Sequence, residues 1–572
     1  MRLDYLKIHD FKNLVDFAVD FDETCNEPVT VVLGRAGSGK SNLYEALVII
    51  FRDLLKGKPT KEFGYDLRYT LRNGKVAVRV WNPPSQRDEE DKFPLPPLTS
   101  KEGKAIDSFS FTITEDGEER RMAKEKILDY LPRYVVTYYS GTSNRLEFHF
   151  FKPQLEFRDE LLDGRTLPLR PLFYAKPIHS QFALLAFFMT EDQQAMEFLK
   201  EYLWIEGLES ALFVLKRPHW AKNKRPRKDG DPRFWYAGGI VKDFLSCVYD
   251  CALAPLRLKG SIQQAFDRTE NTEFLYLYLR DVEKLRELAR QSSEIVRKKD
   301  SRYRKAAQIG KPALSEDNMG EPEGFKAVEF FKLLESTFMS DLIHETRIRV
   351  KVRHAGALTF RELSEGEQQL LTVVGMLRFT RDEDSLFLLD EPDTHLNPAW
   401  GMEYLNILKK HADIGKNSHL LIATHDPLVL TNLRRKQVAI LERDSESGVV
   451  ASFEPEEDPV GMGVQGILRN MFGLRSAVGT EIQEKLDAHA RLLAVGDKRS
   501  NAEEGEFKRL SDELADLGFG REFRDPDYAQ FVRAMARRPE FRKPVLSASE
   551  QKEQEKIADE ILDDILGKGA KK

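Results

Sequence analysis

A glycine-rich loop between an apolar strand and a helix constrains the fold of this chain more than any other feature of its sequence. The apolar run at residues 29–33 predicts a buried strand, and apolar residues at near-helical spacing over residues 43–54 predict a helix. Glycines in such a turn let successive backbone N–H groups converge on a phosphate, and the helix start adds its positive dipole end. The feature therefore predicts a nucleotide-binding α/β fold. The loop comprises Gly34, Arg35, Ala36, Gly37, Ser38, Gly39, Lys40, Ser41 and Asn42.

Two pairs of polar side chains match the chemistry of ATP with Mg²⁺. Lys40 would supply positive charge to the β- and γ-phosphates, and the Ser41 hydroxyl is placed to bind Mg²⁺. Far downstream, the apolar run at residues 385–389 leads directly into Asp390 and Glu391. Because ligands bind at the carboxyl edge of open α/β sheets, we expect Asp390 to hold Mg²⁺ and Glu391 to orient or deprotonate the attacking water. Taken alone, the two acids also fit an ordinary solvated strand end.

A third motif, LSEGEQQL at residues 363–370, precedes a helix with an apolar face. Ser364 and Glu367 have the spacing of a capping box, which alone indicates only a well-capped helix. The segment also resembles the signature motif of ABC-type ATPases, in the form found in SMC, Rad50 and RecF relatives. This resemblance implies that Ser364, Gly366 and Glu367, at the helix N-terminus, face the γ-phosphate of a nucleotide bound by another subunit.

Two further segments extend the resemblance. His425 follows the apolar run at residues 420–424 and matches the switch histidine of the same superfamily, which implies that it senses the γ-phosphate or steadies the attacking water. A lone histidine at a strand end also fits a structural role. Residues 395–398, HLNP, resemble the ATPases of overcoming-lysogenisation-defect and restriction-associated proteins. The glutamine loop of the superfamily has no clear match at residues 139–142; either Ser140 substitutes for it or the loop lies elsewhere.

The motifs also predict an assembly and a domain plan. The chain has one phosphate loop and one signature, so an architecture that pairs them across subunits requires a homodimer or larger oligomer with composite ATP sites. We expect an α/β fold, with an ABC-type P-loop ATPase head, a compact helical insertion and an α-rich C-terminal extension. The expected units are an N-terminal lobe at residues 1–150, a mainly helical insertion at 151–340, a C-terminal lobe at 341–455 and the extension at 456–572.

Several stretches resemble the ATPase subunits of the Septu anti-phage systems, which also occur with retrons and restriction loci. They are residues 171–174, 363–371, 389–398 and 461–474. The resemblance implies an ATPase of a bacterial defence complex that controls an HNH-type partner nuclease. The C-terminal stretch lacks a D-x-D strand pattern, so we expect no nuclease activity in this chain. The alternative is a RecF- or SMC-like DNA-repair clamp, although the insertion lacks the heptads of a long coiled coil.

Composition limits the remaining classes. The 88 Lys and Arg against 94 Asp and Glu give no overall case for nucleic-acid binding, so any such contact must come from the basic segments at residues 221–233 and 297–305. Either segment also fits a solvated surface. Three cysteines are too few for a disulfide framework, and no apolar run is long enough to span a membrane. We therefore expect a cytoplasmic protein that uses no membrane.

Overall fold

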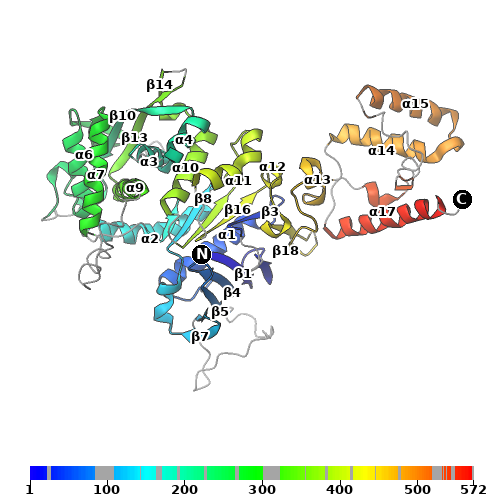
Figure 1. The fold of residues 1–572 in the computed structure, drawn as a ribbon, viewed down its shortest axis with the longest axis horizontal. Helices are drawn as coiled ribbons and strands as arrows, with labels where there is room; N and C mark the ends of the chain where they lie inside the picture. Colours follow the sequence, from blue (N-terminus) through cyan, green and yellow to red (C-terminus); the bar gives the residue numbers. More distant parts are fainter. Residues whose placement is uncertain are drawn as a thin grey trace.

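The computed structural model of the chain contains three β-sheets surrounded by helices (Figure 1). It describes all residues except 22–26, 84–108, 142, 163–169, 190–192, 224–228, 264–268, 300–322, 354–355, 381–383, 413–416, 445, 475–477, 518, 520–530, 532–533, 536–537, 543–547 and 570–572. None of the described helices is both long and apolar enough to cross a membrane.

A seven-stranded sheet forms the centre of the head, in the order β18-β17-β3-β16-β15-β8-β9. All neighbouring pairs are parallel except β17 with β18. The strands β3 (Val29–Gly34), β15 (Ser385–Asp390) and β16 (Ser418–Thr424) are buried along their whole length, as continuous apolar runs predict for a parallel sheet covered on both faces. The other strands are β8 (Tyr134–Tyr139), β9 (Leu172–Tyr174), β17 (Val438–Arg443) and β18 (Val450–Phe453).

Alternate residues of these strands belong to two different cores. Leu386 and Leu388 of β15 pack in a core that contains the apolar side chains of α1 (Lys40–Leu55). Phe387 and Leu389 face a second core with α10 (Glu365–Thr380) and α11 (Pro398–Ala412). This period-two alternation fixes the register of β15, since a slip by one residue would exchange the two faces.

A six-stranded antiparallel sheet covers α1 from the other side, in the order β2-β1-β4-β5-β6-β7. The Phe51 ring of α1 lies edge-on to the Tyr69 ring of the sheet at 6.0 Å. The helix that follows the glycine-rich loop is thus buried between two sheets. The strands are β1 (Arg2–Ile8), β2 (Phe17–Asp20), β4 (Tyr65–Leu71), β5 (Val76–Asn82), β6 (Ser110–Glu115) and β7 (Glu118–Met122).

The described part of the insertion contains more helix than strand, as the sequence predicts, but it also contains a sheet that was not predicted. A five-stranded antiparallel sheet has the order β11-β12-β10-β13-β14. Its strands are β10 (Ile205–Lys216), β11 (Leu256–Gln263), β12 (Thr269–Leu279), β13 (Ile343–Val352) and β14 (Gly356–Thr359). The helices are α2 (Arg145–Leu162), α3 (Ile178–Phe188), α4 (Gln193–Tyr202), α5 (Trp220–Asn223), α6 (Gly239–Cys251), α7 (Val282–Lys299) and α9 (Glu323–Met339).

The same sheet moves the boundary that we placed at residue 340. Strand β13 lies just beyond that boundary, but it pairs with β10 and not with the central sheet of the head. Its buried and exposed residues alternate, which is the pattern of an antiparallel sheet with one wet face. The second half of the ATPase head therefore begins after β14, at the signature motif.

A buried polar network joins the insertion to the head. Arg170 precedes β9 of the central sheet, and its guanidinium lies 2.9 Å from Glu335 of α9. His179 of α3 accepts a hydrogen bond at Nδ1 from the Lys176 N–H, so its Nε2 carries the proton and donates to Glu335. Burial raises the pKa of Glu335, but His179 and Arg170 outweigh it and hold that pKa below its usual value. The network fixes α3 and α9 against the strand that enters the head.

The C-terminal extension is α-rich, as the sequence predicts, and Figure 1 shows it on the opposite side of the head from the insertion. Its terminal helix returns to the beginning of the extension, because Gln551 donates to the Arg469 carbonyl and Lys552 pairs with Glu456 at 2.7 Å. Its main helices are α13 (Gly463–Asn470), α14 (Thr480–Val495), α15 (Asn501–Asp516) and α17 (Ala548–Gly569).

Candidate nucleotide site

The predicted phosphate loop joins β3 to α1. Gly37 and Gly39 have φ angles of 81° and 97°, in the left-handed region that glycine adopts without strain. At Gly34, an added Cβ would lie 2.6 Å from the Leu441 carbonyl oxygen, so the close approach of β17 also requires glycine. Lys40 is buried, and its Nζ donates to the Gly34 carbonyl at 2.5 Å. The lysine ammonium is thus held inside the loop.

Lys40 is desolvated and lies near two carboxylates. Burial lowers the pKa of Lys40, and the nearby carboxylates of Glu391 and Asp390 oppose that shift. Beside the loop, Asn42 donates to Asn13 at 2.5 Å, and Asn13 donates to the Gly37 carbonyl at 3.4 Å. Asn13 was not predicted, because nothing in its local sequence indicates that the turn after β1 reaches the phosphate loop.

Asp390 ends β15 beside Ser41, and the pair fits a magnesium ion. Asp390 is 1% exposed, and its Oδ2 has no hydrogen-bond partner in the structure. Burial raises the pKa of Asp390 to about 6, while a hydrogen bond from Ser41 lowers it. A buried carboxylate oxygen without a partner, next to a serine hydroxyl, matches the oxygen ligands that Mg²⁺ takes beside nucleotide phosphates. The predicted metal ligands Ser41 and Asp390 therefore lie together.

Glu391 and His425 also meet, at the ends of adjacent strands. The His425 Nδ1 lies 3.1 Å from Glu391 Oε1. Since an ionised carboxylate can only accept, Nδ1 carries the proton in this contact. The Glu391 side chain is 31% exposed and the His425 side chain 60% exposed, so both can reach a ligand at the sheet edge.

The backbone of Glu391 is strained. Its φ is 53°, which is uncommon for a residue with a side chain. The Glu391 N–H donates to the Ala423 carbonyl at 2.8 Å, and its own carbonyl accepts from Gln369 at 3.2 Å and from the Thr394 hydroxyl at 2.9 Å. Such strain persists where the surroundings over-determine the conformation, as they do here.

The signature residues form the capping box that their spacing predicts. The Ser364 N–H and hydroxyl both donate to a Glu367 carboxylate oxygen, and the Glu367 N–H donates back to the Ser364 hydroxyl at 3.3 Å. An added Cβ at Gly366 would lie 2.4 Å from the His395 carbonyl oxygen. Gly366 is therefore needed for the signature helix to approach the loop after Glu391. Both contacts lie within one chain, so the predicted contact with a second nucleotide stays a prediction.

The segment after β8 carries a cation where the sequence offers no glutamine. Ser140 lies at the site edge, because its N–H donates to the Asp390 carbonyl at 3.3 Å and its hydroxyl is 3.2 Å from the Thr394 hydroxyl. Five positions later, Arg145 begins α2 and acts on the Asp390 carboxyl through its charge. Arg145 was not predicted, since an arginine at a helix start gives no signal on its own.

The C-terminal extension contacts the start of the phosphate loop. Arg35 donates to the Phe472 carbonyl at 3.2 Å. A cavity of about 240 Å³ lies between the loop, the end of β17, the residues after α13, and Gln551 of α17. The sequence did not indicate this contact, because it joins segments more than 400 positions apart, Arg35 and Phe472.

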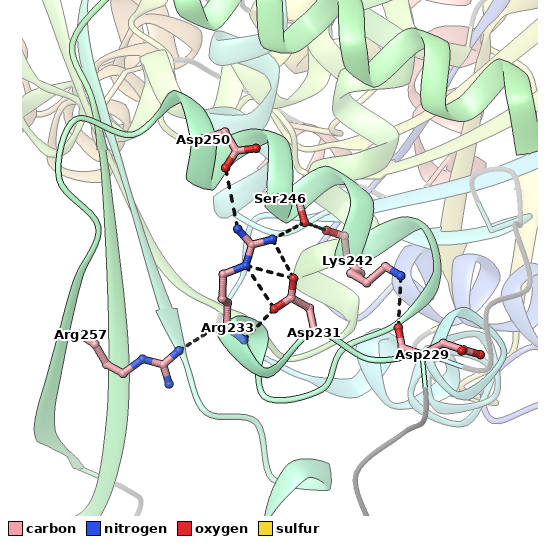
Figure 2. Close-up of polar contacts among 7 residues, drawn as sticks. All are labelled: Asp229, Asp231, Arg233, Lys242, Ser246, Asp250 and Arg257. Atoms are coloured by element: carbon pink, nitrogen blue, oxygen red, sulfur yellow. Dashed lines mark hydrogen bonds and ion pairs between the residues drawn. The ribbon is translucent and has the colours of Figure 1, made fainter.

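The basic segments give limited support to nucleic-acid binding. Residues 224–228 and 300–305 lie outside the described part of the chain. Figure 2 shows that the nearby Arg233 is engaged locally: it contacts both carboxylate oxygens of Asp231, the Ser246 hydroxyl and Asp250. Arg257 donates to the Arg233 carbonyl. Both arginines therefore stabilise the turn around residues 231–233, Arg233 from within it and Arg257 from β11.

Comparisons with known proteins point in one direction. Residues 261–431 match a family described as "AAA domain, putative AbiEii toxin, Type IV TA system". The Septu protein PtuA of Bacillus mycoides (strain KBAB4) is 28% identical over 197 residues, which are 32% of this chain and 27% of that protein. The aligned part thus spans about a quarter of that relative.

Solved structures give a more distant likeness. The SMC head domain from Thermotoga maritima aligns with 80% of this chain over its full length, at 11% identity and a TM-score of 0.30. The Smc head domain with a coiled coil and joint from Pyrococcus yayanosii covers 80% of this chain and 97% of its own, at 12% identity and a TM-score of 0.27. Because these TM-scores are low, the assignment of the fold rests on the sheet topology and the site geometry and not on these structures. On that geometry and the PtuA match, the chain resembles an ABC-type AAA ATPase of the PtuA kind.

Proposed function

We propose that this chain binds and hydrolyses ATP as the ATPase subunit of a bacterial anti-phage defence complex. The observation that carries the proposal is the buried, unpartnered Oδ2 of Asp390 beside Ser41 at the edge of a parallel sheet. Lys40 inside the phosphate loop and the Glu391–His425 pair complete the set of groups that ATP hydrolysis needs.

Each residue has a defined task in this reaction. The loop N–H groups and Lys40 bind the β- and γ-phosphates, and Ser41 and Asp390 would hold Mg²⁺. Magnesium, when bound, neutralises charge on the transferring phosphoryl group. Glu391 accepts a proton from the attacking water or orients it. His425 holds the Glu391 carboxylate through Nδ1 and offers Nε2 to the γ-phosphate side.

We further propose that two copies complete each site. The signature residue Gly366 packs against the loop after Glu391 in its own chain, and the sequence provides only one such motif. In the proposed dimer, this helix N-terminus faces the γ-phosphate bound by the other copy, where its dipole stabilises the anion. The head then comprises the N-terminal lobe and the lobe after β14, with the insertion and the extension on either side.

The defence role rests on the likeness to PtuA. By that likeness, an HNH-type endonuclease would be the partner, and nucleotide state would assemble, restrain or release it in the cytoplasm. Coexpression of this chain with an HNH-type nuclease encoded beside it tests this part. If the purified pair shows neither association nor any effect of nucleotide on DNA or RNA cleavage, the defence assignment is wrong. A gene neighbourhood of replication genes would instead favour a repair clamp.

Mass photometry and steady-state phosphate release test the ATPase part. Glu391→Gln should lower turnover by roughly 100-fold or more, since a general base contributes about that much, and should trap an ATP-bound oligomer. Glu283→Gln on the surface of α7 is the matched control and should behave like the wild type, because Glu283 is exposed and pairs with Arg286 on the same helix. A strictly monomeric protein with unchanged turnover in Glu391→Gln would refute the composite site.

A further inference from the structure

A single buried carboxylate on α1 gathers several basic side chains next to the nucleotide site. Glu45 is 5% exposed, and its Oε2 lies 2.9 Å from Arg145 Nε and 2.5 Å from Lys12 Nζ. Its Oε1 accepts from His149 Nε2 at 3.1 Å. Arg52 donates to His149 Nδ1 at 3.1 Å, and an arginine cannot accept, so His149 is neutral here. One negative charge therefore holds two positive ones, and an excess of positive charge faces the site.

Arg145 lies between this carboxylate and the site. Glu45 is one helical turn after Ser41, so both side chains lie on the same face of α1. β8, which ends six positions before Arg145, pairs in parallel with β15 so that Tyr139 stands opposite Asp390. The Arg145 side chain is 41% exposed; burial raises the pKa of both Asp390 and Tyr139, and the charge of Arg145 opposes that rise. Arg145 therefore follows the strand whose end stands beside Asp390, and its partly exposed side chain has solvent into which it can turn.

We propose that Arg145 exchanges its ion pair with Glu45 for the γ-phosphate of ATP, and so distinguishes ATP from ADP at this site. The inference rests on the proposed ATPase function and adds a residue to its machinery. The planar guanidinium makes two parallel hydrogen bonds to a phosphate, which a lysine ammonium cannot do.

The exchange leaves no buried charge without a partner. When Arg145 turns to the phosphate, Glu45 keeps Lys12 and His149. The movement of Arg145 also pulls on the first turn of α2. Helix α2 as a whole packs against α1 in the head and against α6 and α9 in the insertion. A change of nucleotide at the head therefore reaches the insertion through one continuous helix.

Affinities of the full chain for a non-hydrolysable ATP analogue and for ADP, both with Mg²⁺, test the proposal. Arg145→Ala should weaken binding of the analogue by about tenfold or more, the size of a lost charged hydrogen bond, and leave ADP within about twofold. Arg145→Lys should recover only part of the loss. Arg158→Ala is the matched control, because Arg158 lies on the same helix and pairs with its neighbour Asp159.

The outcomes separate this inference from the proposed function. A purely structural role for Arg145 would weaken both nucleotides equally or neither, and either result overturns the inference. Circular dichroism of each variant checks that the fold is intact, and Arg145→Lys provides a second variant if Arg145→Ala does not fold. If the wild type binds both nucleotides and Arg145→Ala leaves their ratio unchanged, only the inference fails. If the wild type binds neither, the inference and the ATPase assignment fail together.

Discussion

Replacing Asp390 by asparagine should stabilise the nucleotide-free protein while it removes magnesium binding. Burial raises the pKa of Asp390 from 3.8 to about 6, so the folded protein holds its charged form at a disadvantage at neutral pH. At 1.36 kcal/mol per pKa unit, this shift corresponds to about 3 kcal/mol. Asparagine keeps the shape of the side chain and carries no charge. We therefore expect Asp390→Asn to melt a few degrees higher than the wild type at pH 7.

The shifted pKa of Asp390 also predicts how the stability of the folded protein changes with pH. The unfolded chain releases the Asp390 proton near pH 3.8 and the folded chain near pH 6. Between these values the folded state binds more protons, so its stability falls as pH rises, and the penalty is complete above about pH 6. The advantage of Asp390→Asn should thus shrink as the pH falls from 6 toward 4.5.

Thermal unfolding of both proteins across that range, with and without Mg²⁺ and ATP, measures the effect. Mg²⁺ with ATP should stabilise the wild type far more than Asp390→Asn, because the variant has lost a charged ligand of the metal. A variant that is less stable than the wild type without nucleotide at pH 7 would refute the argument from burial.

Two further substitutions test the packing around the site. Gly366→Ala places a Cβ 2.4 Å from the His395 carbonyl oxygen, so the signature helix must shift, which costs about 1–3 kcal/mol of stability. The rate of phosphate release should fall at least tenfold, and a normal rate would contradict the need for glycine. Glu335→Gln leaves Arg170, which is 4% exposed, without its carboxylate, and should lower the unfolding free energy of the insertion by about 3–5 kcal/mol in chemical denaturation. A loss below about 1 kcal/mol would mean that Arg170 finds another partner.

The sequence predicts the central sheet well because its strands have a clear local pattern. The strands β3, β15 and β16 are continuous apolar runs, each ending in a polar motif, and a fully buried parallel strand has no other pattern. The insertion was predicted less well. Strands β10 and β12 pair across 58 to 68 positions, from Lys216 with Phe274 to Ala211 with Leu279. Their alternating side chains lie among strong helical patterns, so the local sequence does not reveal the pairing.

In the candidate site, too, the sequence predicts some residues and misses others. Motif spacing places Lys40, Ser41, Asp390, Glu391 and His425, because each directly follows a strand or begins a helix whose edge the topology fixes. Spacing cannot place side chains that reach the site from elsewhere. Asn13 and Arg145 lie in segments whose positions depend on tertiary packing, and they carry no local pattern.

The strained conformation of Glu391 links the two halves of the proposed composite site. Gln369, on the signature helix, donates to the Glu391 carbonyl and accepts from the His395 N–H at 3.4 Å. Gly366 of that helix packs against the same His395. Because a left-handed backbone costs about 1–3 kcal/mol, Glu391 keeps its position only while this support is intact. In the proposed dimer, a nucleotide on the partner that pulls on the signature therefore also moves the residue that orients water in the chain's own site.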